Sequence, residues 1–446
     1  MLNRKVKSIL DKFALDKGGK ALLITGARQV GKTFSIREFA KRHYDSYLEI
    51  NFIRDREALK IFKDVADEKD VLRRLTAYAG GRIKPGKSLV FLDEIQKCPE
   101  AVTYLKFLVE DGSYRFICSG SLLGVELKNV RSVPVGFLDE IEMHPLDFEE
   151  FLEAVGFDRE ALASVGAAIE RREAVDGFLH DRLMRLWRLY LVVGGMPAAV
   201  QEYVDSNDLA RVADVQRAII ATYHRDISQY DERNALKIRD VYDRLPSELA
   251  SENKRFAIGS VVPGSHFKRI EDGFLWLKNA GVALASYCVA EPKAPLRLSE
   301  KRNMFKLFAN DVGLLAAMYM EGIQLRILNG DRALNIGAVY ENAVAQELTA
   351  HGLRPDYFNS KKQGELDFVL ERGGCIVPVE VKSGKDYKRH SALDKVLADG
   401  NYGIGQAYVL GNDNLSVDGS VVYAPVYATM FIRAPALPEK FVYPTP

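Results

Sequence analysis

The chain has 446 residues, which at about 150 residues per domain corresponds to roughly three domains. Its composition of 47% hydrophobic and 28% charged residues is that of a globular protein, which excludes a mostly disordered chain, a collagen-like repeat and a heptad rod. The formal net charge of +1 excludes a globally basic nucleic-acid-binding protein, although it allows a local basic face.

No apolar stretch approaches the roughly 18 to 20 residues of a membrane span, and the N-terminal segment MLNRKVKSILDKF has charges where a signal peptide needs an apolar core. The scattered histidines argue against a zinc site. The cysteines form no Cys-x-x-Cys pair, which predicts reduced, buried thiols in a cytoplasmic protein. These cysteines are Cys98, Cys118, Cys288 and Cys375.

Residues 1–150 are expected to form a parallel α/β domain. A short basic helix within residues 1–20 ends at Gly18-Gly19. Four short apolar runs then alternate with helical patterns, which is typical of a parallel sheet covered by helices. The runs are ALLITG (21–26), YLEINF (47–52), SLVFLDE (88–94) and YRFICSG (114–120).

The segment GARQVGKT, from Gly26 to Thr33, follows the first run and precedes the helical pattern FSIREFAKRHY. It has the GxxxxGK[ST] spacing of a phosphate-binding loop between a strand and a helix. Glycines let backbone N–H groups turn inward around phosphate oxygens, and the following helix directs its positive end at the same anion. Lys32 adds a charge at the β- and γ-phosphates, and the Thr33 hydroxyl is offered to Mg²⁺.

The sequence therefore predicts ATP and Mg²⁺ as cofactors, and the run LVFLDE supports this. A buried parallel strand delivers its last residues to the ligand crevice. Asp93 is expected to hold the Mg²⁺ shell and Glu94 to polarise the attacking water, which favours a hydrolase over a kinase. The residues predicted to contact the nucleotide are Gly26, Ala27, Arg28, Gln29, Val30, Gly31, Lys32, Thr33, Phe34, Asp93 and Ser121.

Two kinds of auxiliary residue are weaker candidates. Ser119 or Ser121, at the end of the fourth run, is a candidate γ-phosphate sensor, with a plain turn as the alternative. Arg131 and Arg225 are candidates for an arginine finger or a phosphate sensor, with a surface or structural role as the alternative.

The middle of the chain is expected to contain a helical, lid-like region (151–233) and a smaller winged-helix-like unit (234–300). In the smaller unit, SHFKRIEDGFLWLKNAG (265–281) predicts a helix that Ser265 caps at its start and Gly281 at its end. The helical KIRDVYDRLPSELA precedes it, and the strand-like VALASYCV and PLRLS follow it as a wing would.

The second helix of such a unit can enter a major groove of DNA. Its first turn carries His266, Lys268 and Arg269, but the unit is only mildly basic. Contact with DNA and a role as a protein–protein or interdomain spacer therefore both stay open.

Residues 301–446 return to an α/β pattern. The segments GELDFVL and IVPVEVK, separated by a Gly-Gly turn, predict a hairpin that places Asp367, Glu380 and Lys382 on one face. Two carboxylates and a lysine can bind Mg²⁺ and orient a water for phosphodiester attack. The helix VYENAVAQELTAHG adds Glu341, with Glu347 as a weaker choice. The predicted metal ligands are Thr33, Asp93, Glu341, Asp367 and Glu380, and the predicted catalytic residues are Lys32, Glu94, Asp367, Glu380 and Lys382.

The chain resembles a prokaryotic AAA+/STAND-like P-loop ATPase family whose members carry an uncharacterised C-terminal domain. Its C-terminal strands resemble the PD-(D/E)XK nuclease core. The resemblance implies an AAA+-like parallel-sheet domain, a helical and winged-helix-like middle region and a restriction-endonuclease-like α/β domain over 301–446. The segments that carry it include GARQVGKT, FLDEIQ, SGS, HPLDFEEFL, GGMPAAV, YHRDI, FLWLKNAG, KLFANDVGLL, YENAVAQEL, GELDFVL and VPVEVKSG.

The leading hypothesis is an ATP-hydrolysing motor or switch that acts on duplex or branched DNA. The alternative is a nucleotide-controlled signalling or assembly switch whose C-terminal domain is a non-catalytic binding module. A homo-oligomer or a protein partner is compatible with either hypothesis, and no membrane partner is expected.

Overall fold

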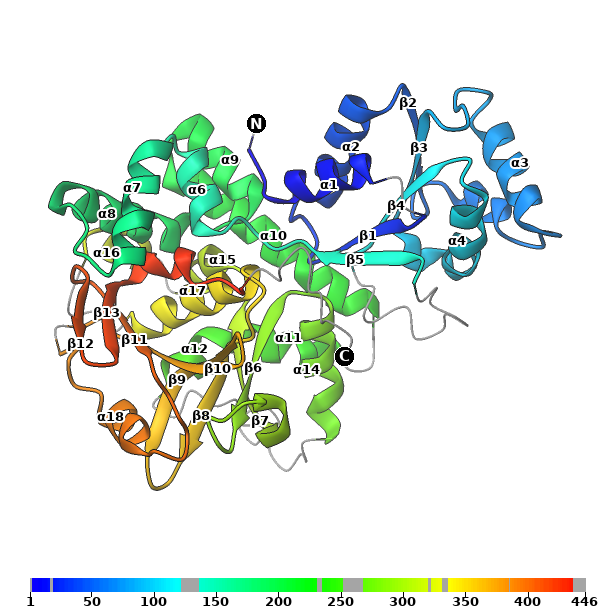
Figure 1. Ribbon diagram of the computed structural model, residues 1–446. Helices are drawn as coiled ribbons and strands as arrows, with labels where there is room; N and C mark the ends of the chain where they lie inside the picture. Colours follow the sequence, from blue (N-terminus) through cyan, green and yellow to red (C-terminus); the bar gives the residue numbers. More distant parts are fainter. Residues whose placement is uncertain are drawn as a thin grey trace, which may run out of the picture. The chain divides into compact units, whose positions relative to one another are not determined.

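The computed structural model in Figure 1 describes most of the chain. The described residues are 2–16, 19–121, 136–230, 235–251, 268–319, 322–330, 336–384 and 386–435. They divide into two compact units, each assembled from three stretches of sequence. Unit 1 comprises Met1–Leu146, Met196–Tyr242 and Lys268–Ala283, and unit 2 comprises Asp147–Gly195, Asp243–Phe267 and Leu284–Pro446. Both units take part of the predicted region 151–233, and the four-domain division stays a prediction.

Unit 1 is built on a five-stranded parallel sheet with the order β2-β3-β4-β1-β5. The four predicted strands are confirmed: β1 (Ala21–Thr25), β2 (Ser46–Asn51), β3 (Ser88–Asp93) and β4 (Arg115–Ser119). A fifth strand, β5 (Leu138–Glu142), was not predicted; it pairs in parallel with β1 at the sheet edge. Its sequence LDEIE is acidic and only partly buried, so it shows no apolar run.

Helices cover this sheet because each has one apolar stripe. α3 and α4 share a buried core with the sheet, to which Leu75, Leu105 and Leu92 contribute. α2 packs against β2, β3 and β4 through residues that include Ile36 and Phe39, and α1 packs on α2 (Figure 1). The bounds are α1 (Val6–Leu15), α2 (Lys32–His43), α3 (Glu68–Tyr78) and α4 (Pro99–Asp111), with short 3-10 turns η1 (Arg56–Ile61) and η2 (Ile95–Lys97).

Later helices complete unit 1. α9 and α10 pack together, and α11 and α14 touch where Gly273 approaches Ile238. α14 confirms the predicted helix over the described residues and ends, as expected, before Gly281; Ser265 and His266 lie outside those residues. The bounds are α9 (Pro197–Ser206), α10 (Leu209–Tyr230), α11 (Ala235–Asp243) and α14 (Lys268–Asn279).

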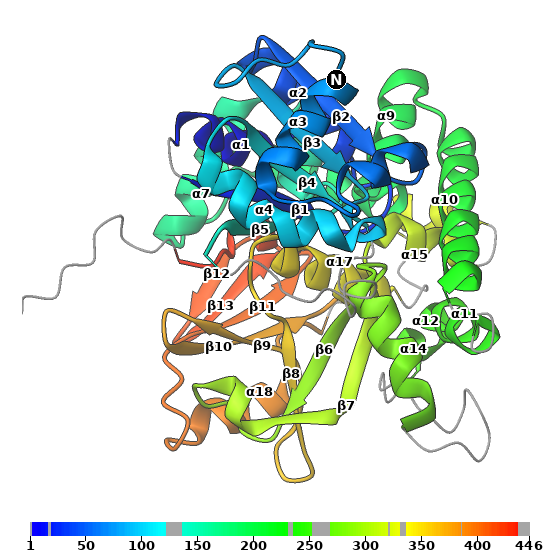
Figure 2. The same cartoon turned by 90° about the vertical axis from the view of Figure 1, so that its right-hand side faces the viewer.

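Unit 2 is built on an eight-stranded mixed sheet with the order β12-β13-β11-β10-β9-β8-β6-β7. Strands β8, β6 and β7 lie beside one another in Figure 2. The bounds are β6 (Ala283–Val289), β7 (Glu300–Ala309), β8 (Asp356–Ser360), β9 (Gly364–Arg372), β10 (Cys375–Val381), β11 (Ala407–Gly411), β12 (Ser416–Asp418) and β13 (Val421–Pro425).

Two expectations for the winged-helix-like unit change here. The predicted strand PLRLS is wrong, because Leu296–Ser299 forms a short 3-10 turn, η4. The strand VALASYCV exists as β6, but it pairs in parallel with β8 of the large sheet. The winged-helix interpretation is therefore not confirmed.

The helices of unit 2 surround α17, whose residues are buried along almost its whole length. α17 contacts α8, α12, α15 and the sheet strands β7 and β10, while α18 packs Leu393 and Val396 into a separate apolar cluster with Val369 and Val409. The bounds are α6 (Phe148–Ala154), α7 (Arg159–Arg171), α8 (Gly177–Val193), α12 (Leu245–Ala250), α15 (Val312–Met318), α16 (Ile323–Leu328), α17 (Gly337–Ala350), α18 (Ser391–Ala398) and the 3-10 turn η5 (Val426–Phe431).

No single helix among the described residues has both the length and the apolar character to cross a membrane; α8 and α9, separated by a bend, meet the criteria only when taken together. All four cysteines are free thiols, and three of them are buried as expected. Cys375 is exposed at the start of β10, which corrects the expectation for that residue.

Candidate functional site

The predicted phosphate loop has the backbone that phosphate binding requires. Gly26 and Gly31 have φ angles of +123° and +97°, a region that favours glycine. A Cβ added at Gly26 would lie 2.2 Å from the carbonyl oxygen of Met143, so no larger residue fits there. Lys32 begins α2 and donates from Nζ to the carbonyl oxygens of Gly26 and Ala27, at 2.8 and 2.7 Å. The loop therefore curls around its lysine.

Lys32 is only 8% exposed, and this burial lowers its pKa to about 8. The carboxylates of Glu94 and Asp93 oppose the shift, while the cation of Arg28 adds to it. Four charged groups thus act on one another at the loop. A bound polyanion would favour the charged form of Lys32.

The ends of three neighbouring strands bring polar side chains together. Parallel register places Asn51 beside Asp93, and Asp93 beside Ser119. Asp93 accepts hydrogen bonds from Asn51 Nδ2 at 2.8 Å and from the Ser119 hydroxyl, and Thr33 Oγ1 lies 3.3 Å from Asp93 Oδ2. A threonine hydroxyl beside a buried carboxylate suits a Mg²⁺ bound with a nucleotide. Asn51 and Ser119 hold that carboxylate in place.

Glu94 follows β3 with a φ of +55°, which is uncommon for a residue other than glycine and occurs preferentially at functional sites. Its Oε2 accepts from Gln96 Nε2 at 2.6 Å and from Ser121 Oγ at 3.3 Å. Ser121 therefore contacts Glu94 directly. The amide oxygen of buried Gln96 has no hydrogen-bond partner among the described residues. It can therefore accept a hydrogen bond from a further donor beside Glu94.

Replacing Glu94 with glutamine is expected to separate nucleotide binding from turnover. The amide keeps the shape and the bonds to Gln96 and Ser121 but removes the charge that orients a water. We expect ATP hydrolysis to fall by about 10²- to 10⁴-fold, with the affinity for a non-hydrolysable ATP analogue changed less than threefold. Phosphate release and calorimetric titration measure the two quantities, and Glu100→Gln at the start of α4 is the control. Undiminished turnover would contradict the role of Glu94.

The remaining predicted residues of this region lie in different settings. Phe34 projects from the first turn of α2 and is 54% exposed. Arg225 is an exposed residue of α10 that donates to Thr222 Oγ1. Arg131 lies outside the described residues. Arg28 forms an ion pair with Asp226 of α10, a contact that no local sequence pattern predicts.

The C-terminal hairpin forms as predicted, with β9 antiparallel to β10 and Phe368 opposite Val379. Between β8 and β9 the register slips, because the Asp356/Val369 pair is followed by Phe358/Leu366. Such a bulge redirects side chains locally and is frequent next to active sites. Asp367 lies in the bulged segment, and its Oδ2 accepts the backbone N–H of Val381 at 2.9 Å.

Glu380 is the most distinctive residue of this hairpin. Its Oε2 accepts from Lys382 Nζ at 2.7 Å, whereas its buried Oε1 has no hydrogen-bond partner among the described residues. Burial raises the pKa of Glu380 to about 7; the nearby Asp367 carboxylate and, more weakly, Glu341 add to the rise, while Lys382 opposes it. A cation bound at Oε1 would relieve both the missing partner and the repulsion.

The predicted set of three carboxylate ligands is corrected by the structure. Among the described residues, no three His, Cys, Asp or Glu side chains are placed so that they could hold a metal ion together. Glu341 is a buried residue of α17, and its carboxylate is the smallest of the influences on the pKa of Glu380. Asp367 and Glu380 stay as a pair, which suffices for Mg²⁺ when substrate phosphates and waters complete its shell.

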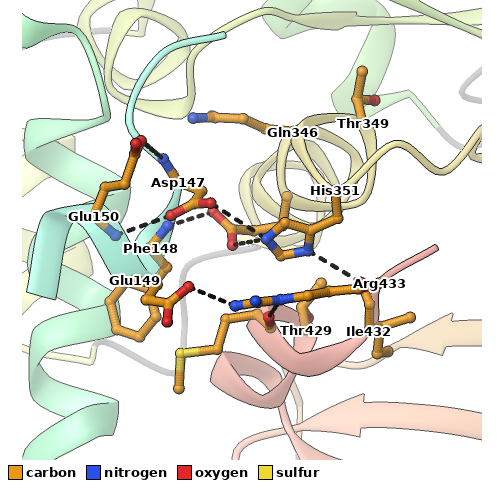
Figure 3. Close-up of polar contacts among 12 residues, drawn as sticks. Asp147, Phe148, Glu149, Glu150, Gln346, Thr349, His351, Thr429, Ile432 and Arg433 are labelled. Carbon is orange, nitrogen blue, oxygen red and sulfur yellow. Dashed lines mark hydrogen bonds and ion pairs between the residues drawn. The ribbon is translucent and has the colours of Figure 1, made fainter. Parts of the chain in front are cut away.

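The alternative residue, Glu347, has a structural role. Its Oε1 accepts from the backbone N–H of Phe148 at 2.7 Å and from the hydroxyl of Tyr190 at 3.0 Å. Figure 3 shows the ring of His351 beside Asp147; His351 Nε2 lies 3.4 Å from Asp147 Oδ2 and Nδ1 lies 3.0 Å from the carbonyl oxygen of Ile432. This buried network joins α6, α8, α17 and η5.

Three family descriptions match successive parts of the chain. Residues 18–152 match an AAA domain. Residues 184–326 and 336–428 match two domains of unknown function, DUF8612 and DUF4143. No curated protein matches the chain.

Several solved structures are similar to the chain at low identity. The Walker-type ATPase PABY2304 of Pyrococcus abyssi is 14% identical, over 72% of this chain and 96% of that chain, with a TM-score of 0.45. The ORC1 protein of Aeropyrum pernix, solved in complex with DNA, is 16% identical over 73% and 94%, with a TM-score of 0.25. The RuvB branch-migration motor of Thermotoga maritima is 12% identical over 66% and 91%, with a TM-score of 0.31.

The family match and the geometry agree for the N-terminal part of the chain. Residues 18–152 contain the parallel sheet, the phosphate loop from Gly26 to Thr33 and the acidic pair that ends β3. These residues form an AAA-type P-loop ATPase domain.

Proposed function

We propose that this protein binds ATP with Mg²⁺, hydrolyses it, and uses the cycle to act on DNA through its C-terminal hairpin. One observation supports ATP hydrolysis most directly. Next to the lysine of the loop, Thr33 contacts the carboxylate of Asp93, and Gln96 donates a hydrogen bond to the carboxylate of Glu94. Nucleotide binding requires the phosphate loop and its lysine. Hydrolysis also requires a second carboxylate that is held in a fixed orientation.

The residues divide the work as follows. The backbone N–H groups of the loop and Lys32 hold the β- and γ-phosphates. Thr33 and Asp93 would hold the Mg²⁺, which when bound neutralises phosphate charge. Glu94, with Gln96 beside it, orients a water and takes up its proton as the water attacks the γ-phosphate.

The test is ATP hydrolysis by the purified protein with Mg²⁺, alone and with single-stranded, duplex or branched DNA. We expect measurable turnover that one DNA class stimulates. Turnover that no DNA changes would support the alternative, a nucleotide-controlled switch whose C-terminal domain only binds a partner. An absence of turnover under every condition would contradict the ATPase proposal itself.

A nuclease activity is the second candidate function, and the unpartnered Oε1 of Glu380 favours it. Asp367 and Glu380 would hold a Mg²⁺, which supplies charge neutralisation at a scissile phosphate. Lys382, bound to Glu380 and 30% exposed at its side chain, can reach the same phosphate or the attacking water.

Replacing Glu380 with glutamine, or Lys382 with alanine, is expected to reduce Mg²⁺-dependent DNA cleavage by about 10²-fold or more, because each change removes a charge that stabilises the transition state. Cleavage is read from linear and branched DNA on a denaturing gel. Asp418→Asn, on the exposed strand β12, is the control and should cut as the parent does. Equal cutting by all four proteins would assign the activity to another site or a contaminant.

A neighbouring copy of the chain is a further proposed partner. ATPases can complete their site with an arginine supplied in trans. Arg131 is the first residue to substitute for that purpose.

A further inference from the structure

Helix α10 contacts the phosphate loop at two points. The guanidinium of Arg28 pairs with the carboxylate of Asp226, and the Tyr223 hydroxyl donates to the carbonyl oxygen of Arg28 at 3.3 Å. Tyr223 and Asp226 are three residues apart, so both lie on one face of α10. One residue of the loop is thus held through its backbone and its side chain by a helix nearly 200 positions later in the sequence.

The Arg28–Asp226 pair belongs to the charge cluster of the loop. The side chain of Asp226 is 9% exposed, and burial raises its pKa; Arg28 opposes the rise and the carboxylate of Glu94 adds to it. Arg28 in turn lowers the pKa of Lys32. Asp226 therefore interacts electrostatically with Glu94, the residue expected to orient the attacking water at the γ-phosphate.

A guanidinium binds carboxylates and phosphates with the same planar fork of N–H donors. Asp226 and the phosphates of a nucleotide are therefore alternative anions for Arg28. The phosphates would also repel the buried carboxylate, which would keep only the weaker influence of Arg225 if Arg28 turned toward them. A buried charge without its partner is strongly unfavourable.

We propose that Asp226 competes with the phosphates of the nucleotide for Arg28, so that binding of ATP weakens the attachment of α10 to the phosphate loop. This inference rests on the proposed function, since it requires ATP at the loop. It assigns Asp226 as a positioning residue that sets nucleotide affinity. It also makes α10 the element that responds to the nucleotide.

Contacts within unit 1 indicate which helices would respond to a change at Arg28. The ring of Tyr223 packs edge-on against Tyr242, at 6.2 Å between ring centroids, and so links α10 to α11. α11 touches α14 where a Cβ added at Gly273 would lie 3.1 Å from Ile238. Past the end of α14, a Cβ added at Gly281 would come within 3.0 Å of the backbone nitrogen of Ala27. Successive contacts through α10, α11 and α14 thus connect Arg28 with Ala27, its neighbour in the loop.

The decisive variant is Asp226→Asn, which keeps the shape of the side chain and removes its charge. Without a charged competitor, Arg28 is released to the phosphates, and we expect the affinity for a Mg²⁺-bound non-hydrolysable ATP analogue to rise about five- to tenfold. Calorimetric titration measures it. The control is Asp214→Asn, an exposed residue of the same helix that pairs with Arg217, and it should leave the affinity unchanged.

Arg28→Ala provides the second half of a double-mutant cycle. In that background Asp226→Asn should raise the affinity much less than in the parent, because the shared partner is gone and only the direct repulsion between carboxylate and phosphates is relieved. If Asp226→Asn instead weakens binding or leaves it unchanged in the parent background, Asp226 does not compete and the inference is wrong. Failure of the unsubstituted protein to bind the analogue would contradict the proposed function as well, so the two failures are distinguishable.

A measurement on the unsubstituted protein covers the case in which Asp226→Asn does not fold. Amide hydrogen exchange of α10 should become faster when the analogue is added, most clearly in the turn that holds Tyr223 and Asp226. Exchange that slows or stays the same in this turn would contradict the inference.

Discussion

Lys32→Ala is expected to abolish ATP hydrolysis, with a fall of at least about 10³-fold. Lys32 is a buried cation at the centre of the phosphate loop, and its burial has already lowered its pKa to about 8. Charge that builds on the phosphates in the transition state would be stabilised there in surroundings from which water is largely excluded. Alanine removes that charge and leaves the carbonyl oxygens of Gly26 and Ala27 without their donor.

Phosphate release under saturating ATP and Mg²⁺ measures this effect, and circular dichroism shows whether the variant is folded. Lys41→Ala is a matched control because Lys41 lies on the same helix, α2, in an exposed pair with Glu38. The control should retain parental turnover, since surface pairs of this kind contribute little to stability. A folded Lys32→Ala variant with parental turnover would overturn the assignment of the nucleotide site.

Local sequence patterns predict those parts of this site whose residues are consecutive in the chain. GARQVGKT combines the glycines, the lysine and the hydroxyl in one turn, and LVFLDE joins a buried strand to its two acids, so local pattern suffices. Asn51, Gln96 and Asp226 were missed because each becomes significant only through its partner. Asn51 ends its strand like many other polar residues, and only the parallel register places it beside Asp93.

The C-terminal hairpin has a similar limit. Alternating residues and a Gly-Gly turn are enough to predict β9 and β10. The bulge in β9 arises from its pairing with β8, and no pattern within GELDFVL predicts it. The same holds for Glu341 and Glu347. Both are acids on one helix, but their separate surroundings in the folded unit decide that Glu347 joins a structural network.

The compact units differ from the predicted regions for a physical reason. Sequence-based boundaries depend on polar or flexible linkers between consecutive regions. Here the chain passes between the units at places such as Gly195-Met196, in the short connection between α8 and α9, where no polar linker marks a boundary. Elements from distant parts of the sequence complete each core, as β6 and β7 do for the large sheet.

Gly194→Ala is expected to destabilise unit 2 by roughly 3 kcal/mol or more. Gly194 ends α8 with φ +72° and ψ −166°, a combination that is essentially restricted to glycine. A Cβ there would lie 2.2 Å from Oδ1 of the fully buried Asp311 and 2.8 Å from the backbone of Gly313. Asp311 cannot move aside freely, because its carboxylate accepts the N–H groups of Gly195 and Leu314 at 2.6 and 2.9 Å. Backbone strain and overpacking each contribute about 1 to 3 kcal/mol.

Calorimetric unfolding is the appropriate measurement, because two units can give separate transitions. A loss of this size is a large part of the 5 to 15 kcal/mol that stabilises a typical domain, so the transition of unit 2 should shift to a markedly lower temperature. Gly177→Ala, at the other end of α8, is the matched control: nothing lies within 4 Å of the added Cβ, and alanine favours a helix by about 0.5 to 1 kcal/mol. Its transition should stay or rise. If Gly194→Ala unfolds at the parental temperature, the close approach of α8 and α15 does not constrain the unit, and the positive φ of Gly194 needs another explanation.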